Sequence, residues 1–227
     1  MPLLYGSLFS GIGGFDLGFD RAGMRCAWQV ELDPYCRKVL TKHWPDVPKH
    51  DDIRTFKPTP VDVICGGFPC QDISNAGPKT GIGGERSGLW GEYVRIIRTV
   101  RPRFVVVENV AALLVRGMGT VLRDLAESGY DAEWSLFSAC RMGAPHMRKR
   151  VFIVAYAEGE RFNTCGEGPE GSERFVADRR DNWRAAERGI VRVAYGVPGR
   201  MDRVRGCGNA VVPDIAEWIG RRLIESV

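Results

Sequence analysis

The chain has 227 residues, of which 44% are hydrophobic, and a formal net charge of +4 at pH 7. That length is enough to bury one large core, or a main domain with a small appendage. No apolar run approaches the roughly 18 residues of a membrane span, and the N-terminus has no basic-then-apolar secretion signal. We therefore expect a cytoplasmic protein with no membrane partner.

The cysteine and histidine content argues against a metal centre. The seven cysteines are odd in number and form no C-x-x-C pair, and the three histidines lie far apart, at His43, His50 and His146. We expect no metal and no disulfide framework, and reduced thiols suit a cytosolic setting.

Positive charge is concentrated in the last third of the chain. Residues 141–206 carry fourteen Lys and Arg against nine Asp and Glu, a balance of +5 that leaves the rest of the chain at −1. This distribution suits a polyanionic partner such as nucleic acid, although an arginine-rich solvated surface would have the same composition.

The first half of the chain alternates apolar runs with helix-period segments, which is typical of βαβ units and a mainly parallel sheet. Strands are predicted at Leu3–Phe9, Ala27–Val30 and Val61–Cys65, with a helix over Phe15–Ala22. Asp33 followed by Pro34 indicates a helix N-cap with proline at the first helical position, so a second helix is predicted from there to about His43.

Residues 66–88 form a long glycine-rich connection, of a kind that is usually functional or disordered. Beyond it, the pattern predicts helices from Leu89 to Val100, around Val121–Leu125 and from Pro213 to about Glu225, and strands at Arg103–Glu108, Glu133–Ser138 and Val151–Ala155. Residues 157–190 are polar with little periodicity, which indicates an irregular insert or small subdomain. The fold class is therefore α/β, with a mostly parallel sheet and helices on both faces.

A glycine loop, Phe9-Ser-Gly-Ile-Gly-Gly14, stands where the first strand passes into the first helix. Glycines there let the backbone approach a ligand and leave free N–H groups at a helix start. The dinucleotide fingerprint G-x-G-x-x-G does not fit, because Asp16 occupies the position of the third glycine. A purely structural tight turn is the alternative.

Two acids strengthen the reading of this loop as a cofactor site. Glu31 ends the second strand about twenty residues on, where a carboxylate can accept hydrogen bonds from ribose hydroxyls. Asp52 and Ile53 precede the third strand and suit an amino group and a flat base. Together they favour an adenosine-containing cofactor over the alternative of a strand-end carboxylate and a turn residue.

Cys70 follows the third strand, in the zone where open α/β sheets carry their chemistry. Pro69 restricts the backbone before it, and a cysteine thiolate is a strong nucleophile. The ordinary role of a free cysteine is that of a small buried hydrophobe. We expect that role for Cys26, Cys36 and Cys65, but not for Cys70.

An acid and two arginines complete the candidate catalytic set. Glu108 ends the strand that starts at Arg103, so its carboxyl is expected at the same edge as Cys70, where it can give a proton to a substrate nitrogen. Arg148 and Arg150 are two residues apart and lie on one side if the chain is extended there. They are candidates for holding a phosphate or a base carbonyl, or else form a solvated basic turn.

In this order the residues resemble the DNA (cytosine-5)-methyltransferase family, from Leu8 to about Ala155 and again from near Tyr195. FSGIGG (Phe9–Gly14) is similar to the family's first cofactor motif, and GFPCQ (Gly67–Gln71) to its catalytic motif. ENV (Glu108–Val110) resembles its acid motif, and GNAVVP (Gly208–Pro213) its last motif, where a C-terminal segment folds back to the cofactor.

The resemblance implies a Rossmann-like, S-adenosylmethionine-dependent methyltransferase fold that acts on a cytosine flipped out of duplex DNA. Cys70 would attack C6 while Glu108 protonates N3, C5 would take the methyl group, and Arg150 would contact the cytosine carbonyl with Arg148 in support. It implies cofactor contacts at Phe9, Gly11, Ile12, Gly13, Gly14, Glu31, Asp52, Ile53, Pro69, Leu89, Asn209 and Val211, and DNA contacts at Gln71, Ser74, Arg148 and Arg150.

The resemblance also implies a domain plan. Residues 1–156 would form the catalytic and cofactor-binding domain, 157–193 a reduced target recognition insert, and 194–227 a segment returning to the catalytic domain. Gly81–Gly88 would be the loop that closes over DNA. We expect a monomer or weak dimer in a bacterial cell or phage-infected host, because short members resemble phage and prophage enzymes, and a role such as protection in restriction–modification.

Two departures and three alternatives accompany the resemblance. The family's Q-x-R-x-R motif starts here with His146, and the insert is far shorter than the usual base-reading domain. A tRNA cytosine-5 methyltransferase shares the fold, but such relatives carry a second proline where this chain has Phe68. A methyltransferase-like DNA-binding subunit that needs a partner protein for target recognition, and a dinucleotide oxidoreductase, are the other two.

Overall fold

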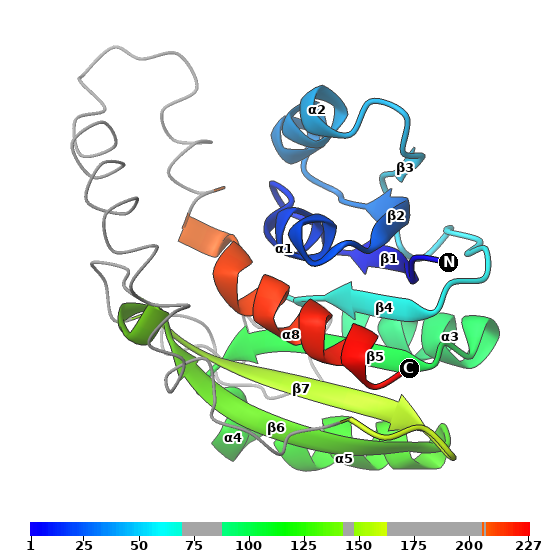
Figure 1. Ribbon diagram of the computed structural model, residues 1–227, viewed down its shortest axis with the longest axis vertical. Helices are drawn as coiled ribbons and strands as arrows, with labels where there is room; N and C mark the ends of the chain where they lie inside the picture. The colour runs from blue at the N-terminus through cyan, green and yellow to red at the C-terminus, as the bar shows by residue number, and fades with distance from the viewer. Residues whose placement is uncertain (70–87, 143–147, 163–205, 207) are drawn as a thin grey trace.

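The computed structural model describes residues 1–69, 88–142, 148–162, 206 and 208–227. Within them, one seven-stranded sheet runs in the order β3-β2-β1-β4-β5-β7-β6 (Figure 1). The strands are β1 (Leu4–Leu8), β2 (Arg25–Val30), β3 (Lys49–His50), β4 (Val63–Gly66), β5 (Phe104–Val110), β6 (Tyr130–Ser138) and β7 (Lys149–Ala157). The pairings from β3 through β5 are parallel, while β7 runs antiparallel to β5 and β6. The predicted α/β class with a mostly parallel sheet is confirmed.

Helices cover both faces of this sheet. The described helices are α1 (Gly14–Ala22), α2 (Pro34–His43), α3 (Leu89–Val100), α4 (Leu113–Arg116), α5 (Met118–Glu127) and α8 (Pro213–Glu225), with a 3-10 turn, η2, at Ala139–Met142. Figure 1 shows α1 and α8 together on one face and α3, α4 and α5 on the other. The last helix of the chain therefore packs directly on the first.

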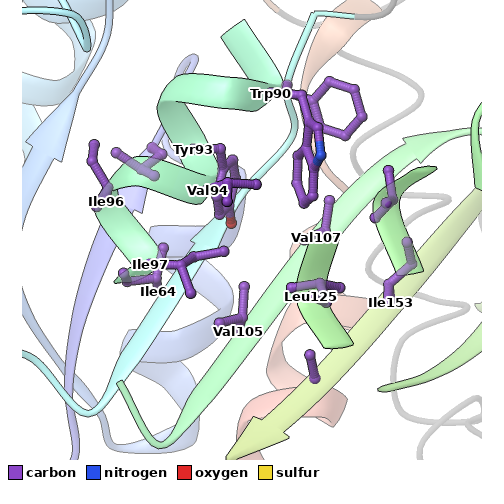
Figure 2. Packing of buried hydrophobic residues seen from close by; sticks show 14 of the residues in the cluster. Ile64, Trp90, Tyr93, Val94, Ile96, Ile97, Val105, Val107, Leu125 and Ile153 are labelled. Atoms are coloured by element: carbon purple, nitrogen blue, oxygen red, sulfur yellow. The ribbon is translucent and has the colours of Figure 1, made fainter. Parts of the chain in front are cut away.

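The helix that follows the glycine-rich segment contributes five buried residues to the core on its face of the sheet. The apolar residues of α3 recur at helical spacing, and the side of the helix that they form is buried. Figure 2 shows this packing, in which Trp90, Tyr93, Val94, Ile96 and Ile97 meet Ile64, Val105, Val107, Leu125 and Ile153. The arrangement fixes the start of α3 against the ends of β4 and β5.

The start of α2 follows its sequence signature. The carboxylate of Asp33 accepts hydrogen bonds from the backbone N–H of Tyr35 at 2.8 Å and of Cys36 at 3.3 Å, and Pro34 is the first helical residue. An aspartate N-cap satisfies N–H groups that have no partner within the helix. The predicted second helix is thus confirmed over Pro34–His43.

The acid of the fifth strand lies inside the strand and not at its end, which corrects the prediction. β5 continues to Val110, because β7 pairs with it as far as the contact between Val110 and Arg150. A polar pair such as Glu108 and Asn109 reads as a strand end in sequence, but the antiparallel partner satisfies its backbone groups. β3 and α4 were not predicted, because two and four residues are too few to show a period.

The part of the chain that the structure describes contains neither a membrane-spanning helix nor a metal-binding cluster. None of its helices is long and apolar enough to cross a membrane. No group of three or more His, Cys, Asp or Glu side chains there is arranged to hold a metal ion.

Candidate active site

The sequence-predicted site residues that the structure describes gather at one edge of the sheet, at the carboxyl ends of its parallel strands. The glycine loop follows β1, Glu31 follows β2, the segment Gly67–Pro69 follows β4, and Glu108 lies near the end of β5. The edge is where open α/β sheets bind their ligands. Cys70, Gln71, Ser74, His146 and most of the Gly81–Gly88 loop lie outside the described residues.

The glycine loop is tied to the end of β2 by the carboxylate of Glu31. One carboxylate oxygen accepts from the backbone N–H of Gly11 at 2.7 Å, and the other from that of Asp33 at 2.7 Å. The backbone of Phe9 has φ of +51°, a left-handed conformation that costs a bulky residue energy and is found where a site imposes it. Glu31 and the glycine loop are therefore joined in one hydrogen-bonded unit.

The C-terminal segment lies against this loop. A Cβ atom on Gly14 would stand only 2.5 Å from the carbonyl oxygen of Val211, so the first turn of α1 and the segment before α8 approach at a distance that only glycine permits. Arg148 donates a hydrogen bond to the carbonyl of Gly208, while Asn209 is exposed. The chain thus returns to the loop at the positions that resemble the family's last motif.

Asp52 and Ile53 stand in the irregular segment between β3 and β4. The guanidinium of Arg54 donates to both carboxylate oxygens of Asp52, from Nε to Oδ1 at 2.9 Å and from Nη2 to Oδ2 at 2.6 Å. These hydrogen bonds lower the pKa of Asp52. The side chain of Ile53 is buried in the core. An amino group bound by Asp52 would share its carboxylate with Arg54.

A sealed carboxyl group lies beneath the glycine loop, and sequence reasoning missed its role. Asp16, in the first turn of α1, is fully buried and accepts from Gln29 Nε2 at 2.7 Å, Ser7 Oγ at 3.1 Å and Cys26 Sγ at 3.6 Å. Desolvation raises the pKa of Asp16 to about 6, against the hydrogen bonds from Gln29 and Ser7, which lower it. Its helical spacing from the buried Phe19 was the available signal.

The segment before Cys70 is held by β5 from two sides. A Cβ atom on Gly67 would meet Oε2 of Glu108 at 2.6 Å, so the glycine lets the carboxyl lie against the backbone. The amide of Asn109 donates to the carbonyl of Phe68 at 3.1 Å. Phe68 itself is buried, with its ring 5.0 Å from that of Trp90 in α3. Both flanks of residues 70–87 are thus packed on one another.

Glu108 occupies a dry, positively charged corner. Only 7% of it is exposed, and Arg150 Nε lies 3.0 Å from its Oε1, close enough for an ion pair but without the alignment of a hydrogen bond. Desolvation raises the pKa of Glu108, while the charges of Arg150 and Arg148 oppose that rise. A carboxyl group that keeps its proton more readily than usual suits proton donation.

The remaining predicted residues divide clearly. Cys26, Cys36 and Cys65 are buried, as predicted, but Cys26 also donates a hydrogen bond to Asp16 through its Sγ. Arg148 Nε is buried without a hydrogen-bond partner in the described part of the chain, so Arg148 belongs as much to the interior as to a nucleic-acid surface. Leu89 and Pro69 are half-buried on either flank of residues 70–87.

The chain is similar in sequence to several bacterial type II methyltransferases. The chain is 34% identical over 175 residues to the type II methyltransferase M1.HphI of Haemophilus parahaemolyticus, and 38% identical over 158 residues to M2.BsuMI of Bacillus subtilis, matches that cover 70% and 66% of this chain. These matches span 47% and 41% of the two relatives, so the chain is short beside them. M.AquIA of Picosynechococcus is 33% identical, with 75% of this chain and 79% of the relative covered.

Solved structures agree on the fold. A prophage-encoded protein of E. coli described as a DNA modification methyltransferase aligns with a TM-score of 0.59 at 25% identity, over 69% of this chain and 47% of that one. Spodoptera frugiperda DNMT2 aligns with a TM-score of 0.60 at 18% identity, over 73% and 53%, which supports the fold alone. A family model described as C-5 cytosine-specific DNA methylase matches residues 4–188, most of the chain. The chain therefore belongs to the C-5 cytosine-specific DNA methylase family.

Proposed function

We propose that this chain is a DNA cytosine-5 methyltransferase, which moves a methyl group from S-adenosylmethionine to C5 of a cytosine flipped out of duplex DNA. The observation that carries the proposal is the position of Glu108. Its buried carboxyl, with a raised pKa, lies against Gly67, three residues before the cysteine of the GFPCQ motif. An acid and a thiol at one sheet edge are what covalent attack with proton delivery requires.

In the proposed reaction, Cys70 attacks C6 of the cytosine as a thiolate. The π electrons of the C5=C6 bond then form a C4=C5 bond, those of the C4=N3 bond move onto N3, and Glu108 delivers its proton to N3, which leaves an enamine nucleophilic at C5. C5 would take the methyl group with S-adenosylhomocysteine as the leaving group, and N3 would return its proton to Glu108. A base then removes the C5 proton, the C5=C6 bond forms again, and the C6–sulfur bond breaks to release the thiolate. Arg150 would hold the cytosine carbonyl and keep Glu108 oriented through their ion pair.

The cofactor contacts that we propose are at Phe9, Gly11, Ile12, Gly13, Gly14, Glu31, Asp52, Ile53, Pro69, Leu89, Asn209 and Val211. The residues fit such a group, because the glycine loop has a left-handed backbone at Phe9, and the carboxylate of Glu31 lies beside the loop and accepts from the N–H of Gly11. S-adenosylmethionine supplies an electrophilic methyl group when bound. Asp52 would accept from an adenine amino group, and Ile53 would limit the water around the base.

The nucleic-acid side of the proposal covers Gln71, Ser74, Arg148 and Arg150. The hydrogen bond from Arg148 to Gly208 supports a second role for Arg148, which is to hold the C-terminal segment beside Glu108 and Arg150. We propose residues 157–193 as a reduced target recognition insert and 194–227 as the returning segment. A monomer or weak dimer that acts on DNA in the cytoplasm of a bacterial or phage-infected cell, as in restriction–modification, completes the proposal.

One observation bears on each of two alternatives, a tRNA methyltransferase and a partner-dependent subunit. The argument for DNA over tRNA rests on Phe68, and since Phe68 is only 3% exposed, any such preference acts through the shape of the loop and not through direct contact. The shortness of the insert at residues 157–193 favours the second alternative, a subunit that needs a partner protein to recognise its target. The oxidoreductase is not supported, because Asp16 stands in place of the third glycine and lies buried below the loop.

The test is transfer of labelled methyl groups from S-adenosylmethionine to duplex DNA and, separately, to tRNA. Cys70→Ala should abolish transfer to DNA and leave cofactor binding intact. Cys65→Ala is the matched control, since Cys65 is wholly buried in β4 and should be replaceable with activity retained. Full activity of Cys70→Ala would sink the nucleophile assignment. Transfer to tRNA alone, or cofactor and DNA binding without transfer, would favour the tRNA enzyme or the partner-dependent subunit, respectively.

A further inference from the structure

The irregular segment 51–56 is tied to α3 by one arginine side chain. Arg95 Nη2 donates to the carbonyl oxygen of Ile53 at 2.7 Å and makes a longer contact, 3.5 Å, with that of Phe56. We infer that Arg95 is a positioning residue for the adenine end of the cofactor site, an inference that rests on the proposed function.

The guanidinium of Arg95 is itself oriented from the other side. Its Nε donates to Glu92 Oε2 at 2.6 Å, one helical turn earlier on α3. A guanidinium is planar and presents its donors in a fixed fork, so binding one edge to a carboxylate sets the direction of the other. Glu92 therefore aims Arg95 at the carbonyl of Ile53.

The backbone of this segment has few other restraints, although the side chain of Ile53 is buried in the core. Its own backbone hydrogen bonds are turn contacts, from Thr55 N to Asp52 O at 3.2 Å and from Phe56 N to Ile53 O at 3.4 Å. The ring of Phe56 packs on Trp28 at 4.9 Å and anchors the far end. Arg95 makes the shorter of the two hydrogen bonds to the carbonyl oxygen of Ile53, at 2.7 Å against 3.4 Å from Phe56 N. It therefore holds the backbone just before the exposed turn.

This tie joins two parts of the proposed cofactor site. α3 starts at Leu89, which is one proposed contact, and the segment carries Asp52 and Ile53, which are two more. The Arg95 side chain is 40% exposed, so it contributes little to the core, and its loss should affect the placement of the segment more than the fold. Without it, the turn that carries Asp52 would sample several positions while the side chain of Ile53 stays in the core, and the cofactor would have to order that turn on binding.

The experiment compares Arg95→Met with Arg98→Met in the otherwise intact chain. Arg98 is one turn further along α3, 52% exposed, and donates to Ser128 Oγ at 3.0 Å, so its removal costs a similar bond away from the segment. Arg95→Met should raise the dissociation constant of S-adenosylhomocysteine, measured by calorimetry, by about tenfold, the effect of losing one hydrogen bond to a charged donor. KM for S-adenosylmethionine should rise in parallel, with kcat at saturation unchanged.

A second probe separates positioning from general loosening. In S-inosylhomocysteine the amino group of adenine is replaced by oxygen, which Asp52 cannot accept from. The wild-type chain should discriminate between the two ligands, and Arg95→Met should reduce that ratio, while Arg98→Met and the conservative Arg95→Lys should preserve most of it.

The outcomes are distinct. If wild-type protein binds S-adenosylhomocysteine and Arg95→Met binds it equally well, or no worse than Arg98→Met, the inference is overturned and the proposed function stands. A fall in kcat with KM unchanged would also overturn it. If wild-type protein binds no S-adenosyl ligand, both the inference and the proposed function are wrong.

Discussion

Asp16→Asn is the substitution whose effect the structure predicts most quantitatively. The wild-type carboxyl is sealed between α1 and the sheet, where it accepts hydrogen bonds from Gln29, Ser7 and Cys26. The other titratable groups facing it are Tyr5, Asp20, Cys26, Lys49 and Cys65, and of these only Lys49 carries a positive charge. Asparagine has nearly the same shape, can still accept from Gln29, and is neutral at every pH.

The magnitude follows from proton linkage. The pKa of Asp16 is raised from 3.8 to about 6 in the folded chain, which corresponds to about 3 kcal/mol at about 1.4 kcal/mol per pKa unit. Since the folded state binds the proton more tightly, this stabilisation is fully present below pH 3.8 and is lost as the pH rises through 6. Between pH 8 and pH 5 the wild type should gain about 1 kcal/mol relative to Asp16→Asn.

Urea unfolding at pH 5, 6, 7 and 8 measures this difference. Asp16→Asn should be the more stable protein at pH 8, with the gap closing toward pH 5. Asp51→Asn, which alters an exposed carboxyl, should follow the pH profile of the wild type. A difference between wild type and Asp16→Asn that does not change with pH would refute the argument that burial holds a proton on Asp16.

Two further substitutions test the catalytic corner. Glu108→Gln keeps the shape of the side chain but removes its proton, so kcat for methyl transfer should fall by about 10²–10⁴-fold with the KM for S-adenosylmethionine unchanged; a loss below twofold would exclude Glu108 as the acid. Asn109→Ala leaves the carbonyl of the buried Phe68 without its donor, so the free energy of unfolding in urea should fall by about 1–3 kcal/mol, whereas an unchanged midpoint would show that the bond is dispensable.

Elements with strong local signals were predictable from the sequence. The N-cap of α2 needs only Asp33 and Pro34, and α8 needs only the spacing of Ile215, Ile219 and Leu223 after a proline. Both have the predicted bounds, because neighbours in sequence determine them. β3 was not predictable, since two residues become a strand only when β2 supplies a partner.

The candidate site was predictable in its parts but not in its connections. Spacing predicted Glu31 beside the glycine loop, and Glu108 at the sheet edge where the strand before Cys70 also ends. Both predictions follow from parallel strands sharing an edge. The hydrogen bond from Asn109 to Phe68 and the burial of Asp16 depend on contacts between distant segments. The partners of Asp16 and Asn109 lie in other segments, so no local pattern identifies them, although the spacing of Asp16 from Phe19 pointed to the buried side of α1.

The most direct test of the central claim is bisulfite sequencing of DNA from a methylase-negative bacterial host that expresses this chain. It reports activity, the methylated atom of the base and the sequence context together. The account predicts C5-methylated cytosines, which resist deamination by bisulfite, in a defined sequence context. They should be found with Cys65→Ala and be missing with Cys70→Ala. Protection that persists in Cys70→Ala, or DNA without any protected cytosine although the chain is folded and binds S-adenosylmethionine, would contradict it.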